Sequence, residues 1–262
     1  MAIKNIFKKA KNSSGKTFKH SGNLGDIIFS LPTIIALGGG KLYLSNKTPG
    51  VETRKFTDDM LEQMIELLKT QSYLSDVCRY NGEDIDYNLD KFREIFACYD
   101  HIARWHLKAF NAQFDLTRAW LENIKPIRTR DIVINDTRRE GDVALDWPIL
   151  SKYEDMCVFA GFEHEYNGFI KSWSLNIPRH PTKTILEFAG VIKGAKLFIG
   201  NQSLGFALAE AMKVPRILKV HHHCPSCMPL SENARIILTE KILKHTFGIK
   251  KNFLSSVKLP RF

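Results

Sequence analysis

The chain has 262 residues and a formal net charge of +10, with 44% hydrophobic and 25% charged residues. This composition excludes a disordered or fibrous protein and predicts a globular chain with a buried core and one or two domains. No apolar run is long enough to span a bilayer, and the sequence around Ile3 lacks the apolar core of a secretory signal, so we expect neither feature.

The first half of the chain alternates between strand and helix patterns. A strand beginning at Thr17 precedes a glycine-bracketed loop, Gly22–Asp26, and apolar residues then recur at helical spacing as far as Ile35. This pattern predicts that Asp26 begins a helix at the carboxyl end of the first strand, the edge of an open α/β sheet where ligands bind. The next predicted elements are a strand at 41–44, a helix capped by Thr57, a strand at 77–80 and a helix at 102–110.

A polar segment that contains a proline, Lys125–Arg130, is predicted to link two units. After it the pattern restarts, with strands at 131–135, 157–160, 196–200 and 216–220 and helices at 184–193 and 204–212. Alternation of this kind predicts parallel sheets with helices on both faces. We therefore expect an α/β protein with two domains, residues 1–127 and residues 128–262.

Two loops at strand ends are the main candidates for chemistry. Asp26 is either a helix cap, which is the commoner role, or a general base that takes a proton from an incoming hydroxyl. The loop Gly200–Gly205 lies between a strand and a helix N-terminus, where free N–H groups and the helix dipole favour a phosphate. The alternative for this loop is an ordinary turn in which Ser203 caps the helix.

Three further motifs have competing interpretations. The run Thr137-Arg138-Arg139 follows a strand and would either clamp a diphosphate or form a solvated turn. The triplet Asp84-Ile85-Asp86 matches the Asp-x-Asp of metal-dependent sugar transferases, but so short a match arises easily by chance. The segment His221–Cys227 would bind zinc only with a second ligand pair, which does not follow, so we favour a loop whose histidines face a cleft and predict no metal.

Two of these stretches resemble one family. Gly25–Pro32 resembles the N-terminal signature of the heptosyltransferase-like glycosyltransferases, and Phe198–Ser203 with Ala209–Pro215 resembles their C-terminal nucleotide-sugar motif. The resemblance is looser through Cys157–Gly161, and the middle of the chain is divergent. It implies the GT-B architecture, two Rossmann-like domains facing across a cleft, with the C-terminal segment returning to the N-terminal domain. It also implies an inverting glycosyltransferase that needs neither metal nor cofactor beyond its nucleotide-diphosphate sugar.

The same resemblance assigns roles to individual residues. Asp26 matches the catalytic base, and Glu210 either contacts the nucleotide ribose or is a solvated helix residue. The expected donor-binding residues are Thr137, Arg138, Arg139, Asn201, Gln202, Ser203 and Glu210. The expected acceptor or loop contacts are Asn23, Leu24, Gly25 and His221.

One departure from the family concerns the donor sugar. Heptosyltransferases proper carry Asp-Thr-Gly and a histidine three residues beyond the glycine, where this chain has Gln202, Ser203, Leu204 and Ala207. This departure disfavours heptose as the donor sugar and favours a hexosyl- or pentosyltransferase. It does not disfavour a nucleotide sugar as the donor.

The positive charge lies at the two ends of the chain. Six basic residues precede Ser21 and six follow Glu240 without an acidic residue among them, and the other 26 basic residues are balanced by 28 acidic ones. Such ends are either solvated tails or binding segments for a polyanion or an anionic membrane. The acceptor is accordingly either hydroxymethylated bases of phage DNA, favoured by charge, or a bacterial surface saccharide such as lipopolysaccharide core, favoured by the resemblance.

Two alternatives to an enzyme remain open from the sequence. One is a catalytically inactive nucleotide-sugar-binding protein, and the other is a plain nucleic-acid-binding protein. The cysteines bear on location, because they are odd in number and mostly have apolar neighbours, which predicts reduced thiols in the cytoplasm of a bacterial or phage-infected cell, with or without peripheral contact to the inner membrane. They are Cys78, Cys98, Cys157, Cys224 and Cys227.

Overall fold

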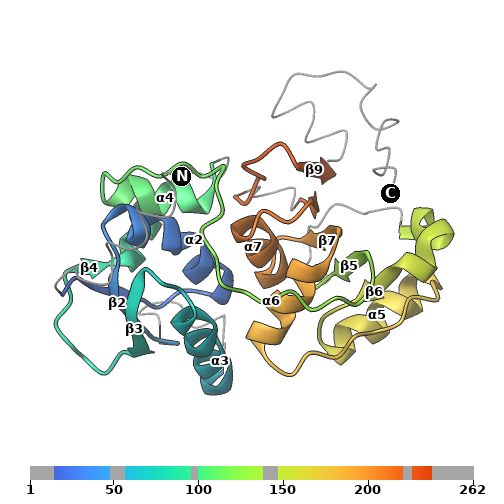
Figure 1. Cartoon of the computed structure of the whole chain (residues 1–262), viewed down its shortest axis with the longest axis horizontal. Helices are drawn as coiled ribbons and strands as arrows, with labels where there is room; N and C mark the ends of the chain where they lie inside the picture. The colour runs from blue at the N-terminus through green and yellow to red at the C-terminus, as the bar shows by residue number, and fades with distance from the viewer. Residues whose placement is uncertain (1–14, 48–56, 96–99, 138–146, 221–225, 238–262) are drawn as a thin grey trace.

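A computed structural model describes residues 15–47, 57–95, 100–137, 147–220 and 226–237, which form two β-sheets with helices packed on them (Figure 1). The first sheet has the order β3-β2-β1-β4, with β1 (Thr17–His20), β2 (Gly40–Leu44), β3 (Leu74–Arg79) and β4 (Tyr87–Asn88). The second has the order β6-β5-β7-β8-β9, with β5 (Ile132–Asn135), β6 (Cys157–Phe159), β7 (Leu197–Asn201), β8 (Arg216–Lys219) and β9 (Ala234–Ile237). The strand pairs are parallel, so the predicted α/β class is confirmed.

Helices connect the strands in both halves. The first half contains α2 (Leu24–Ala36), α3 (Asp58–Lys69), a 3-10 helix (Leu89–Ile95) and α4 (Ile102–Ala109). The second contains a 3-10 helix (Trp147–Met156), α5 (Glu163–Trp173), α6 (Ile185–Gly194) and α7 (Leu204–Ala211). Thr57 caps α3 as predicted, because its hydroxyl accepts a hydrogen bond from Met60 N at 3.2 Å. Among the described helices, none combines the length and hydrophobicity of a membrane span.

An extended segment carries the chain from α4 to β5, and the predicted domain boundary between residues 127 and 128 lies within it. This segment is packed against α6. Ile127 N donates to Gly190 O at 2.8 Å, and a Cβ built on Gly190 would lie 2.9 Å from Ile127 Cδ1. Glycine therefore allows the segment to approach the helix closely, while the division into two domains at this point stays a prediction.

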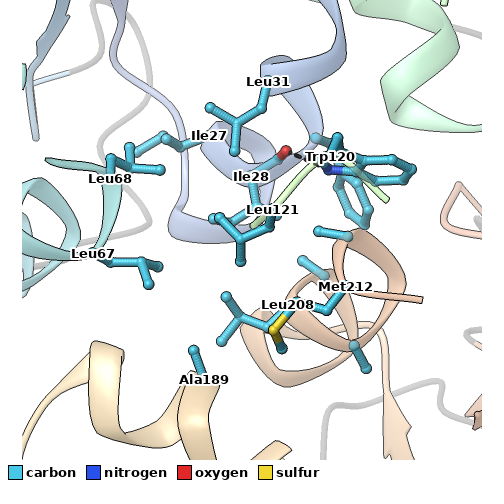
Figure 2. Close-up of a cluster of buried hydrophobic side chains, with 14 of the residues drawn as sticks. Ile27, Ile28, Leu31, Leu67, Leu68, Trp120, Leu121, Ala189, Leu208 and Met212 are labelled. Carbon is cyan, nitrogen blue, oxygen red and sulfur yellow. Dashed lines mark hydrogen bonds between the residues drawn. The ribbon is translucent and has the colours of Figure 1, made fainter. Parts of the chain in front are cut away.

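One apolar core includes side chains from both sheets, and a second apolar cluster lies within the second half. Helix α2 packs against α7, and α3 packs against α6, so that two pairs of helices cross between the halves. Figure 2 shows the buried side chains where they meet. The labelled residues are Ile27, Ile28 and Leu31 of α2, Leu67 and Leu68 of α3, Trp120 and Leu121 of the extended segment, Ala189 of α6, and Leu208 and Met212 near the end of α7. Burial of these side chains holds the two halves in a fixed relation.

Trp120 is part of this core and supplies a hydrogen bond that α2 lacks. Pro32 lies inside α2 and has no N–H, so it cannot donate to the carbonyl of Ile28 one turn earlier. The indole Nε1 of Trp120 donates to that carbonyl at 3.1 Å (Figure 2). Trp120 N also donates to Ala211 O at 2.9 Å, at the end of α7. One fully buried residue of the extended segment thus hydrogen-bonds to helices of both halves.

The described cysteines are free thiols. Cys78, Cys157 and Cys227 form no disulfide, and Cys157 and Cys227 are buried. Burial raises the pKa of the Cys157 thiol to about 12, which suits a core residue and disfavours a reactive thiolate. Cys98 and Cys224 lie outside the described residues.

Candidate functional site

A pocket of about 430 Å³ opens between the two halves of the molecule. Its volume falls in the range of small-molecule sites. One wall comes from the first half, through the beginnings of α2 and α3. The other wall comes from the loops after β5, β6 and β7 and from the beginning of α6. The first wall contains Leu24, Thr57, Asp59, Met60 and Gln63, and the second contains, among others, Asn135, Thr137, Phe162, Glu165, Arg179, Lys183, Ile185, Phe188 and Ser203.

Asp26 lies in the first turn of α2 and is partly exposed. Its Oδ2 accepts a hydrogen bond from Asn23 Nδ2 at 3.2 Å. A Cβ built on Gly25 would lie 3.7 Å from Ala207 Cβ and 4.0 Å from the Ser203 carbonyl oxygen, so α2 and α7 begin against one another. Asp26 is not among the lining residues of the pocket, whereas Leu24 and Ser203, on the two sides of this contact, do line it. The structure thus makes neighbours of the two loops that the sequence singled out.

The loop before α2 is anchored by Asp90, from the first 3-10 helix. Asp90 accepts hydrogen bonds from Lys19 Nζ at 2.5 Å, from Ser21 N at 3.0 Å and from Ser21 Oγ at 2.5 Å. Burial alone would raise the pKa of Asp90, but the charge of His20 in its protonated form and these donors hold that pKa well below its usual range. Burial lowers the pKa of His20 to about 3, so its neutral ring accepts a hydrogen bond from Gly22 N at 2.8 Å. These bonds fix the chain that leads to α2.

Polar side chains at the ends of β5 and β7 form a hydrogen-bond network. Asn201 Nδ2 donates to Thr137 Oγ1 at 2.7 Å, and Asn201 Oδ1 accepts from Thr137 N at 3.3 Å. Ser203, the N-cap residue of α7, donates from Oγ to Asn135 Oδ1 at 3.1 Å and does not cap the helix. Uncapped N–H groups and the helix dipole attract an anion, so this helix start is a candidate phosphate cradle. Gln202, between Asn201 and Ser203 in the sequence, is partly exposed.

A buried ion pair lies at the same sheet edge. Lys219 is the last residue of β8, and Asp136 directly follows β5. Lys219 Nζ donates to Asp136 Oδ1 at 2.7 Å. Both side chains are almost completely buried. A buried pair contributes little net stability, but removing one partner is costly, so the pair fixes the position of the chain that enters Thr137.

Glu210 is completely buried in α7, so of its two predicted roles the solvated helix residue is wrong, while the ribose contact stays a prediction. Its Oε1 pairs with Lys213 Nζ at 2.5 Å, and its Oε2 pairs with Arg216 Nη2 at 2.5 Å. Burial lowers the pKa of both basic groups, and the Glu210 carboxylate opposes that shift by stabilising their charged forms. Because its oxygens serve this pair of cations and it does not line the pocket, Glu210 takes no part in the function proposed below.

Three predicted site residues, Arg138, Arg139 and His221, lie outside the described residues, so their roles stay predictions. The Asp-x-Asp triplet is described and has a structural role in part. Asp86 Oδ2 accepts hydrogen bonds from Thr17 N at 2.8 Å and from Thr17 Oγ1 at 3.0 Å, which anchors the beginning of β1. Within the part of the chain that the structure describes, no group of three His, Cys, Asp or Glu residues is arranged to hold a metal ion.

The structure adds pocket residues that the sequence reasoning missed. Glu165 Oε2 accepts a hydrogen bond from Phe162 N at 2.9 Å at the beginning of α5, and Phe162, which lines the pocket, is 52% exposed. Arg179 Nε donates to Gly161 O at 3.2 Å. The sequence held a local signal for this part of the pocket, because Gly161 follows a predicted strand and is followed by Glu163 and Glu165. The wall formed by α3 had no such signal, since only the tertiary structure brings it to the second half.

Comparison with known proteins bears on the fold. No family model matches the chain, and no curated protein matches it at a significant level. A glycosyl transferase of family 9 from Veillonella parvula matches in structure with a TM-score of 0.61 at 11% identity, over 87% of this chain and 89% of that one. The E. coli heptosyltransferase WaaC, in a structure with ADP-2-deoxy-2-fluoro heptose, matches with a TM-score of 0.57 at 11% identity, over 86% of this chain and 93% of that one. The fold of this chain is therefore similar to the fold of these two glycosyltransferases, as the sequence resemblance predicted.

Proposed function

We propose that the chain is a glycosyltransferase that moves a sugar from a nucleotide-diphosphate sugar to an acceptor hydroxyl. The observation that supports this proposal best is the contact between the beginnings of α2 and α7 beside the pocket. It brings the segment that carries Asp26 next to the candidate phosphate cradle at Ser203. The two solved structures named above are both of glycosyltransferases, and one of them holds a nucleotide-sugar analogue.

The mechanism follows from these two groups. The donor diphosphate binds at the N–H groups of α7, beside Ser203 and Thr137. Asp26 takes the proton of the acceptor hydroxyl, and the acceptor oxygen attacks the anomeric carbon from the face opposite the diphosphate. The bond from that carbon to the diphosphate oxygen breaks, the nucleoside diphosphate leaves with the electron pair, and the configuration inverts. In this proposal the N–H groups of α7 meet the negative charge of the leaving group, so the step uses no metal ion.

The acceptor is either a bacterial surface saccharide or hydroxymethylated bases in phage DNA. DNA is a polyanion, and the saccharide acceptor lies beside an anionic membrane surface. The basic ends of the chain would bind either one. A gel shift with duplex DNA at increasing salt, compared with binding to anionic vesicles, separates the two. Retention of DNA that falls steeply with salt favours the DNA acceptor, and vesicle binding alone favours the saccharide.

A transfer assay tests the proposal. The chain is incubated with ADP-, GDP- and UDP-sugars and each class of acceptor, and release of nucleoside diphosphate is measured. Asp26→Asn should lower the rate by about 100- to 10,000-fold while nucleotide affinity is retained. Asp84→Asn removes an exposed carboxylate outside the pocket and serves as the matched control.

Three outcomes would contradict parts of this proposal. Transfer at the wild-type rate by Asp26→Asn would refute the assignment of the base. Donor binding without turnover on any acceptor would instead support an inactive nucleotide-sugar-binding protein. Tight DNA binding with no thermal stabilisation by any nucleoside diphosphate would indicate a plain nucleic-acid-binding protein.

A further inference from the structure

The part of the pocket wall that comes from α3 is one from which the sequence predicted no ligand contact. Thr57, Asp59, Met60 and Gln63 come from the beginning of α3, in the opposite half of the molecule from the candidate phosphate cradle. In Figure 1, α3 and α6 lie side by side, and α2 and α7 form the other crossing between the halves. The pocket therefore extends from the α2–α7 contact, where the proposed chemistry takes place, to the α3–α6 contact.

Gln63 is held in one orientation at the α3–α6 contact. Its Oε1 accepts a hydrogen bond from Ile185 N, the first residue of α6, at 3.0 Å. Its Nε2 donates to Asp59 Oδ2 at 2.7 Å. Because a backbone N–H can only donate, the first bond determines which amide atom is the oxygen.

An amide held in this way retains further hydrogen-bonding capacity. A glutamine amide has two donor hydrogens and two acceptor lone pairs, and these two bonds use one of each. A donor beside an acceptor is the arrangement with which glutamine pairs with the edge of a nucleobase. The side chains of Met60, Ile185 and Phe188 line the same part of the pocket and offer apolar contact to a flat ring.

The position of the diphosphate determines which part of the donor reaches this end. If the phosphates lie at the beginning of α7 and the sugar faces Asp26, the nucleoside must extend away from the α2–α7 contact. We propose that the nucleobase of the donor binds between α3 and α6, and that Gln63 reads its edge from the first half of the molecule. This inference rests on the proposed function, and it adds that base selectivity depends on a residue outside the half that binds the phosphates.

Calorimetric titration with ADP, GDP, UDP and CDP tests this inference through the ratios of their affinities. The wild-type chain should prefer one base, and Gln63→Leu should weaken the preferred nucleotide by about 10- to 100-fold and bring the four affinities close together. Gln63→Glu keeps the acceptor for Ile185 N but replaces both amide donors by an acceptor, so it loses the bond to Asp59 as well as the donor offered to the base and should change which base is preferred. Glu66→Ala, on the exposed face of the same helix, is the matched control and should leave the ratios unchanged.

The possible failures are distinguishable. If Gln63→Leu lowers all four affinities equally, Gln63 only holds the two halves together and the inference is wrong. Loss of selectivity in Phe162→Ala, with selectivity kept in Gln63→Leu, would put the base over the Phe162 ring and would also overturn it. A wild-type chain that binds nucleoside diphosphates without preference refutes the inference alone, whereas one that binds none refutes the proposed function as well.

Discussion

Replacing Trp120 by phenylalanine tests how the extended segment holds the two halves together. The change keeps an aromatic ring but removes the indole N–H that donates to Ile28 O at 3.1 Å. That carbonyl is buried in α2, and Pro32 cannot donate to it, so it loses its hydrogen bond. A buried polar group without a partner costs about 1–3 kcal/mol. The smaller ring leaves about 40 Å³ unfilled, which adds about 1 kcal/mol.

We therefore expect Trp120→Phe to lower the free energy of unfolding by about 2–4 kcal/mol, measured by urea unfolding with circular dichroism. Pro32→Ala restores the missing N–H donor within α2. It should stabilise the Trp120→Phe chain more than it stabilises the wild type, with a coupling of about 1 kcal/mol in the double-mutant cycle.

The matched control is Trp147→Phe. Trp147 is also buried, but its Nε1 has no hydrogen-bond partner among the described residues, so this change should cost only the lost volume. Equal destabilisation by Trp120→Phe and Trp147→Phe, together with strictly additive effects of Pro32→Ala and Trp120→Phe, would refute the reasoning.

Two further predictions concern buried ionisable groups. Burial lowers the pKa of His20 to about 3, of His101 to about 4, and that of His106 well below its usual value. The unfolded chain then binds more protons than the folded chain below pH 6.5, so stability is retained above that pH and falls as the pH drops, by about 1 kcal/mol per histidine between pH 6.5 and 5.5. Urea unfolding at several pH values measures this slope, and a stability that is constant or rises on acidification contradicts it. Glu210→Gln leaves two buried cations without their carboxylate and should cost about 3–5 kcal/mol in the same assay, and a loss below about 1 kcal/mol would contradict the buried network.

Local patterns predicted the parts of the fold that depend on neighbouring residues. The strand, glycine-bracketed loop and helix from Thr17 to Ala36 follow from spacing alone, and β7 with α7 was predicted in the same way. Helix α5 was missed because it is mostly polar and contains Gly168, which weakens a helical pattern. The edge strand β4 was missed because its two residues are too few to show alternation. The edge strand β9 was missed although it is as long as β1.

The candidate site was predictable only in part, since much of it is created by tertiary contacts. The adjacency of Gly25 and Ser203 follows from strand ends that face the same cleft, and the sequence indicated both loops. The position of Gln63 depends on the packing of α3 against α6, which no local pattern reveals. The sequence left Glu210 either a ribose contact or a solvated helix residue, and its buried hydrogen bond with Arg216 on the next strand is a tertiary contact that neither prediction included.

A crystal structure of the chain with the nucleoside diphosphate that stabilises it most would test the central claim directly. The diphosphate is predicted to lie at the N–H groups of α7 beside Ser203 and Thr137, with the base between α3 and α6 and Asp26 facing the space beyond the terminal phosphate. A nucleotide bound outside the 430 Å³ pocket, or a diphosphate turned toward α3, would contradict the proposed site.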